Sequence, residues 1–180
     1  MAAGAGTAFA QTQEEKLQDV NARWELTEEG KVVFCEQFEF PDMTRDELFN
    51  HSVAYVREAV GEGSAVSADK ENGLIRCSAV FPQVYPDRKG IDPAKCVSVE
   101  YDLVVEVRDS KARIRVILNR YDLPLAIAAQ ESDRPIDWYP VNVLGKKKVY
   151  GLDLLYNTSR ESENLFAAYP RHIRGLLSQK

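Results

Sequence analysis

The sequence predicts an α+β domain of two layers, in which an antiparallel sheet carries its helices on one face. Three observations lead to this prediction. The strand-like segments alternate apolar and polar residues, which is typical of antiparallel sheets with one buried and one wet side. The two clear helical segments each carry a single apolar stripe. The predicted order is β-α-β-β-β-β-α, with short turns between several of the strands.

Residues 32–60 contain the first long strand and the first clear helix. The helix begins at Thr44 and Glu47, whose capping-box spacing lets each side chain bond a free backbone N–H of the first turn. Either Gly61 or Gly63 can end it. The strand places on one face Val32, Phe34, Phe38 and Phe40. The helical stripe consists of Leu48, Phe49, Val53, Val56, Ala59 and Val60.

Two hairpins follow this helix. Asn72-Gly73 between alternating runs predicts a two-residue type I′ turn. In that register Val66 is opposite Ala79, Ala68 is opposite Cys77, and Asp69 is opposite Arg76. The second hairpin turns at Asp109-Ser110, so that Glu106 meets Arg113, Val105 meets Ile114, and Leu103 meets Val116. Its charged residues predict a solvated outer ladder rather than a catalytic pair.

The segment from Pro82 to Lys95 contains three prolines and predicts a long loop rather than a strand interior. Long loops on rigid scaffolds often carry function, although a tolerated insertion explains this one equally well. Farther on, Thr158 and Glu161 repeat the capping-box spacing and predict a C-terminal helix over 159–179. Pro170 lies inside that helix and predicts a kink.

The domain organisation predicted is a single domain over 24–180, with a core at 30–122 and a C-terminal extension that holds the last helix. Residues 11–23 form a polar linker or a frayed helix. Ala8-Phe9-Ala10 before Gln11 is typical of a signal-peptidase site, so residues 1–10 are interpreted as the tail of a signal peptide. We therefore expect export to the periplasm or the cell exterior.

Several residues resemble a known family of exported bacterial proteins. They are Gly30-Lys31-Val32-Val33-Phe34, Phe38, the run from Pro41 to Leu48, and Glu71-Asn72-Gly73-Leu74-Ile75. The family is the one catalogued as domain of unknown function 4468, and the resemblance covers roughly Gly30 to Asp122. The resemblance implies a fold like that of the TATA-box-binding protein. It also implies that the protein is exported, as members of this family from Gram-negative gut bacteria are. It supplies no catalytic residues.

The composition argues against several classes of protein. The formal net charge of −5 opposes nucleic-acid binding, for which a basic surface is typical. No apolar run is long enough to span a membrane. The three cysteines, Cys35, Cys77 and Cys96, show no metal-ligand spacing, and an odd count leaves at least one thiol free in a monomer. No cofactor or metal is expected, and the disulfide state stays open.

The sequence favours a non-catalytic binding or interaction module of the cell envelope. Tyr85, Arg88 and Trp138 are the predicted ligand contacts, because they lie in the long loop and in an aromatic, turn-prone segment. The partner would be a small ligand or an envelope protein. One alternative is a small hydrolase that gathers His51 or His172 with acids in space. Another is a structural protein that self-associates through a sheet edge.

Overall fold

The computed structural model describes residues 12–61, 64–85, 90–92, 95–124 and 149–177. Helices and strands follow the chain in this order: α1 (Gln13–Asn21), β1 (Trp24–Leu26), β2 (Val32–Glu39), α2 (Arg45–Val60), β3 (Val66–Asp69), β4 (Leu74–Tyr85), β5 (Val97–Arg108), β6 (Lys111–Asp122) and α5 (Val149–Leu177).

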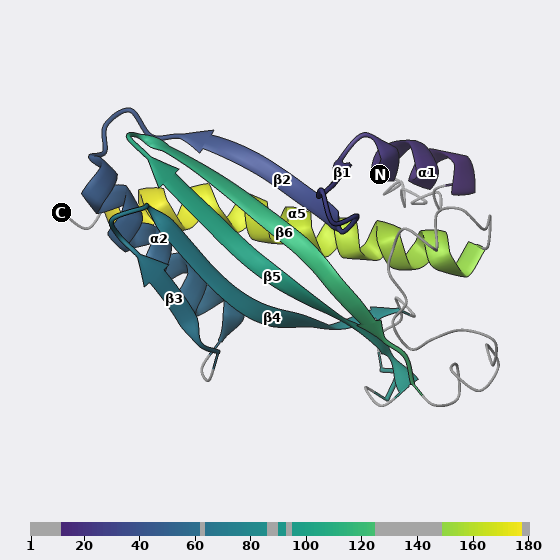
Figure 1. The fold of residues 1–180 in the computed structure, drawn as a ribbon. Coiled ribbons are helices and arrows are strands. Elements are labelled where there is room, and N and C mark those ends of the chain that lie inside the picture. The colour runs from purple at the N-terminus through teal and green to yellow at the C-terminus, as the bar shows by residue number, and fades with distance from the viewer. Residues whose placement is uncertain (1–11, 62–63, 86–89, 93–94, 125–148, 178–180) are drawn as a thin grey trace, which may run out of the picture.

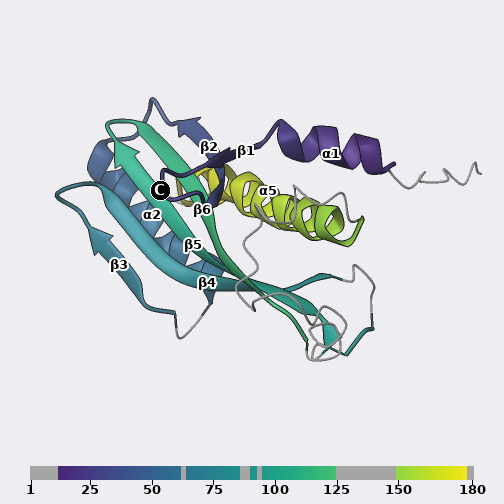
Figure 2. The same ribbon diagram turned by 45° about the vertical axis from the view of Figure 1, so that its right-hand side comes forward.

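The strands form one sheet in the order β1-β2-β6-β5-β4-β3, and each neighbouring pair is antiparallel. Figure 1 shows α2 and α5 together on one side of this sheet, with α1 alongside the first half of α5. The turned view in Figure 2 shows the same two layers, with none of the described helices on the other side of the strands. The predicted α+β architecture with helices on one face is therefore confirmed. We call the helix side the covered face and the other side the open face.

Alternation in the strands, with few exceptions, builds the core on the covered face. Along β5 the covered face receives every second side chain, and these are at most 3% exposed: Val97, Val99, Tyr101, Leu103, Val105 and Val107. On β6 the corresponding side chains are Ala112, Ile114, Val116 and Leu118. Burying this much apolar surface is the main driving force for folding, at about 25 cal/mol per Å².

Tyr169 of α5 is the centre of the contact between the two helices and the sheet. Its ring, which is fully buried, lies 5.4 Å from that of Phe38, 5.8 Å from that of Phe40 and 5.1 Å from that of Tyr55. The Ser52 hydroxyl donates its single proton to the carbonyl of Leu48, at 2.6 Å. The Tyr169 hydroxyl is therefore the donor in its 2.7 Å bond to Ser52 Oγ.

Pro170 lies inside α5 and removes one backbone donor from the helix. Side chains bond two carbonyls of the turn that precedes it. The Tyr55 hydroxyl donates to the carbonyl of Leu165 at 2.5 Å, and Arg171 Nε donates to the carbonyl of Ala167 at 2.9 Å. The bond from Tyr55 also fixes α2 against α5 at this point.

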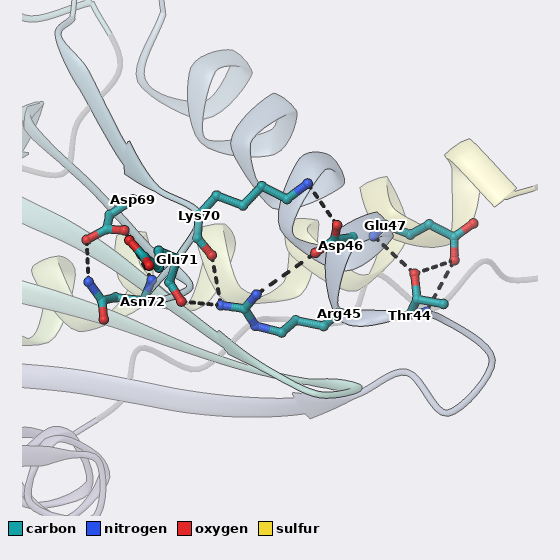
Figure 3. A network of polar contacts seen from close by, with 8 residues as sticks. All are labelled: Thr44, Arg45, Asp46, Glu47, Asp69, Lys70, Glu71 and Asn72. Carbon is teal, nitrogen blue, oxygen red and sulfur yellow. Dashed lines mark hydrogen bonds and ion pairs between the residues drawn. The ribbon is translucent and has the colours of Figure 1, made fainter.

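The N-terminus of α2 is fastened to the β3–β4 turn, as Figure 3 shows. The predicted capping box is present, because Thr44 and Glu47 each bond the backbone N–H of the other. Arg45 donates to the carbonyls of Lys70 and Glu71, at 2.8 Å each. Lys70 Nζ lies 2.9 Å from Asp46 and, mainly through this bond, lowers the pKa of that carboxyl.

The β3–β4 turn differs from the prediction. Val66 pairs with Cys77 and Asp69 with Leu74, so the loop holds four residues, 70–73, and the register is shifted by two. Asp69 explains the difference: its carboxylate accepts both the backbone and the side-chain N–H of Asn72 and closes the wider turn. These bonds, the side-chain one first, also lower the pKa of Asp69. A shift of two residues keeps every side chain on its predicted face.

The other predicted hairpin register is confirmed. Glu106 pairs with Arg113, Val105 with Ile114, and Leu103 with Val116.

The predicted start of the last helix is wrong. The helix is already formed at Val149, and Thr158 lies in its interior, where Oγ1 donates to the carbonyl of Leu154 at 2.7 Å. Thr158 therefore does not cap a helix, and the capping-box spacing of Thr158 and Glu161 arose by chance. Residues 13–21 are likewise a helix, α1, with a capping box at Thr12 and Glu15, rather than a linker.

Strand β4 runs farther than expected. It passes through Pro82 and ends at Tyr85, with a register shift against β5 between Phe81 and Tyr85. A bulge of this kind is where a strand tolerates proline, because the missing N–H is not needed for the ladder. The predicted loop is therefore shorter, and its residues 86–89 and 93–94 lie outside the described part of the chain.

Gly73→Ala is expected to destabilise the fold more than Gly30→Ala. Both glycines have positive φ, +66° and +79°, which costs a side chain about 1–2 kcal/mol. A Cβ at position 73 would also lie 2.2 Å from the carbonyl oxygen of Val107. A Cβ at position 30 would have no atom within 4 Å. Gly73→Ala should therefore cost about 1–3 kcal/mol more in urea unfolding. Equal losses for the two variants would contradict this packing.

Stability is expected to fall between pH 10 and 12. Burial, with a smaller contribution from Glu58, raises the pKa of Tyr55 from 10.0 to about 12. The folded state therefore favours the neutral hydroxyl of Tyr55. Its contribution to the free energy of unfolding is complete below pH 10 and is lost as the pH rises through 12. The total loss is about 3 kcal/mol. Urea unfolding across this range should show the loss. Tyr55→Phe should make the loss smaller by about this amount, at a cost of about 1 kcal/mol at neutral pH. Some loss should remain, because burial also raises the pKa of Tyr101 and Tyr169. An unchanged slope would contradict the assignment.

Candidate functional site: a groove on the open face

A groove of about 790 Å³ crosses the open face of the sheet. One end is formed by the β1–β2 turn, with Thr27, Glu28 and Glu29, and the other by Ala65 and Ser67 beside and in β3. These are the two edges of the sheet, five strand spacings apart. At about 4.8 Å per spacing the groove is roughly 24 Å long.

The floor of the groove is apolar at its centre. Val104 of β5 and Ile117 of β6 line it, and they are diagonal neighbours across the two strands. Val33 of β2 pairs with Ile117 and extends the patch. Val104 and Val33 are 3% and 5% exposed, although α2 and α5 lie on the other face of the sheet.

Charged residues surround this floor. Arg76 of β4 lies exposed in the groove wall, and Glu28 and Glu29 lie at the opposite end. Between them Asp102 accepts a hydrogen bond from Ser78 Oγ at 2.6 Å. The groove therefore has an acidic end, an apolar middle and a basic side near β3.

Arg115 is the polar group of the floor with the greatest capacity for a further bond. One guanidinium nitrogen is ion-paired with Glu106 on the neighbouring strand. Its Nε is buried and has no hydrogen-bond partner. A buried donor without an acceptor costs about 1–3 kcal/mol, which an incoming acceptor would recover.

The sequence-predicted contacts do not form this site. Tyr85 ends β4, where it is half-buried and pairs with Val97 beyond the bulge, outside the groove lining. Arg88 and Trp138 lie outside the described residues.

The two histidines lie on the helices and line neither the groove nor the second cavity considered below. His172 Nδ1 is 3.0 Å from Glu58 Oε2, between α5 and α2, but Glu58 is 74% exposed and so belongs to the surface. His51 is half-buried on α2. The hydrolase alternative required a histidine beside an acid within a cleft, and these positions give it no support.

The three cysteines are all free. Cys77, beneath the helices, is 5% exposed, and burial raises the pKa of its thiol to about 11. Cys35 is on the open face and accepts a bond from Arg113 Nε at 3.0 Å. Among the described side chains, no group of three or more His, Cys, Asp or Glu is arranged to hold a metal ion. Within the same ranges, no helix combines the length and hydropathy needed to cross a membrane.

Comparison with known proteins relates this sheet to a family. Residues 34–121 match the model described as "Domain of unknown function (DUF4468) with TBP-like fold". This part of the chain is therefore similar to DUF4468 domains. The matched segment contains the strands β4, β5 and β6 that supply most of the groove floor, so the open face lies largely within it. No curated protein matches the chain.

Two solved structures share the fold. A DUF4468 family protein from Bacteroides ovatus has a TM-score of 0.64 at 15% identity, covering 91% of this chain and 96% of its own. A TBP-like protein from Parabacteroides distasonis has a TM-score of 0.61 at 17% identity, covering 82% of this chain and 96% of its own. At this level of identity the likeness concerns the fold alone. It confirms the TBP-like architecture of this chain.

One signal in the sequence marks the groove. Val33, Val104 and Ile117 are apolar residues at positions where strand alternation calls for polar, outward-facing ones. Such breaks of pattern are expected at functional sites. The charges around them carry no comparable signal, because exposed charges occur along every strand of the sheet.

Arg76→Ala and Ile75→Ala test which face supports the fold. The two residues are neighbours on β4, with Arg76 in the groove and Ile75 fully buried on the covered face. Urea unfolding should show a change of less than about 0.5 kcal/mol for Arg76→Ala. Ile75→Ala should cost about 2–5 kcal/mol, because it leaves a cavity in the core. A large loss for Arg76→Ala would show that the groove is part of the structural core.

Proposed function

We propose that this protein is a non-catalytic binding module that holds an extended segment of a partner protein across its open face. The observation that carries this proposal is the apolar floor at Val104 and Ile117, set between the acidic turn and Arg76. Apolar centres with polar rims are typical of protein interfaces. A groove of roughly 24 Å accommodates about seven residues of extended chain.

Charge complementarity specifies the kind of segment. A basic side chain would lie at Glu28 and Glu29, an apolar one on the floor, and an acidic one at Arg76. The Arg115 Nε, which is buried and has no hydrogen-bond partner, offers a bond to an incoming acceptor such as a backbone carbonyl. An acidic turn at one end does not suit a phosphate backbone, which supports a protein partner over a nucleic acid.

A peptide library with members about as long as the groove tests this proposal. Peptides selected on the intact protein should carry a basic, an apolar and an acidic residue in that order. They should lose about tenfold or more in affinity for Arg76→Glu, because a favourable charge becomes a repulsive one. Arg57→Glu is the matched control, because Arg57 is exposed on α2 and belongs to the opposite layer. Equal binding to both variants would overturn the proposal.

We also propose that the protein acts outside the cytoplasm, with a protein of the cell envelope as its partner. What supports this is the Ala8-Phe9-Ala10 pattern before Gln11. The N-terminus of the protein recovered from the envelope fraction of its own cells should then be Gln11. A cytosolic protein that retains residues 1–10 would contradict export, and would leave peptide binding to be judged by its own test.

A further inference from the structure

Glu36 breaks the pattern of β2 on the opposite side of the sheet from the groove. It lies between Phe34 and Phe38 on the covered face, and its partner across the sheet is Ile114, which is fully buried. An apolar residue is expected there, yet the chain carries an exposed carboxylate. β1 pairs only with residues 32–34, so on the edge of β2 away from β6 no described strand pairs with position 36.

A pocket of about 490 Å³ lies beside this carboxylate, which is within the size range of small-molecule sites. It is bounded by β2, by the middle of α5 and by the segment that joins α1 to β1. Three aromatic residues line it: Phe34, its cross-strand partner Trp24, and Phe166 of α5. A hydrogen bond from the indole N–H to Asn21, at 3.2 Å, restrains the ring of Trp24.

The charges of this pocket are unbalanced. Arg23 is the one basic residue in its lining, and it is already ion-paired with Asp19, at 2.7 Å, and with Glu163. Glu25 also lines the pocket, and its carboxylate interacts electrostatically with Arg113. Glu36 has no ion pair with any described basic residue, and so it leaves a negative charge at an aromatic pocket.

We propose that this pocket binds an organic ammonium cation with an apolar body. The ammonium group would donate to the Glu36 carboxylate in charge-assisted hydrogen bonds. The apolar body would lie against Trp24, Phe34 and Phe166, and the aromatic faces attract cations in their own right. Amines and the side chains of lysine and arginine belong to this class. This site is independent of the groove, because the two lie on opposite faces of the sheet.

Cyclohexylmethylammonium is a suitable probe, with cyclohexylmethanol and cyclohexanecarboxylate as its neutral and anionic counterparts. The full chain carries two tryptophans, so Trp138→Phe leaves Trp24 as the single fluorescent reporter. Titration at fixed ionic strength, by Trp24 fluorescence and by calorimetry, should show saturable binding of the ammonium. Its affinity should exceed that of the alcohol and of the carboxylate by about tenfold or more.

Glu36→Gln should remove this preference and leave the unfolding free energy unchanged, because the residue is exposed and carries no ion pair. Glu39→Gln is the matched control: it lies on the same strand, faces the other side and pairs with Lys111 at 2.6 Å. It should bind the probe as the unmodified protein does. Equal affinity for the ammonium and the alcohol, or undiminished binding by a folded Glu36→Gln protein, would overturn the proposal.

Discussion

The structure depends on the alternation of its strands, which sends nearly all of the large apolar side chains to one face of the sheet. That face needs a complete cover, since each exposed apolar side chain would forfeit about 1.5–3 kcal/mol. α2 and α5 provide the cover, and Tyr169 joins them through its bond to Ser52 and its ring contacts with Tyr55 and with β2. Because both helices lie on this side, no helix of the described residues lies over the opposite face.

An uncovered sheet face can serve as a binding surface without any change to the core. In this protein the open face is neither uniformly polar nor basic. It has an apolar centre at Val104 and Ile117 and charges of both signs around it. The TBP-like fold supplies the surface, but a fold does not determine function. The polypeptide partner that we propose rests on the residues of this face rather than on the fold.

Most of the architecture could be predicted from the sequence, because alternation and helical spacing act locally. The capping box at Thr44 and Glu47 began a helix as predicted, since Met43 and Leu48 beside it are both buried. The same spacing at Thr158 and Glu161 began nothing, because the apolar residues before it already continue a helix. The β3–β4 register also escaped prediction: the side chain of Asp69 bonds Asn72 and widens a turn that Asn-Gly alone would close in two residues.

The candidate sites were harder to predict. Both depend on residues from distant parts of the chain: the groove joins the 26–29 turn to β3, and the aromatic pocket joins Trp24 to Phe166. The sequence instead predicted Tyr85 as a ligand contact, because it lies in a proline-rich segment. In the structure Tyr85 pairs with Val97 in the sheet. The useful signals were two exceptions to strand alternation: an apolar residue, Val104, on the open face and an acidic residue, Glu36, on the covered face. Such exceptions indicate a site only when the neighbouring strands are known.

The native cysteines offer the most direct measurement of the one-sided cover. Cys35 lies half-buried on the open face, whereas Cys77 lies beneath the helices with its pKa raised to about 11. The folded protein should be treated with an aromatic disulfide reagent at pH 8, and the labelled positions identified by peptide mass. The account predicts that Cys35 reacts in the folded protein and that Cys77 reacts only as urea unfolds it. Labelling of Cys77 as fast as Cys35 in the folded protein would contradict it.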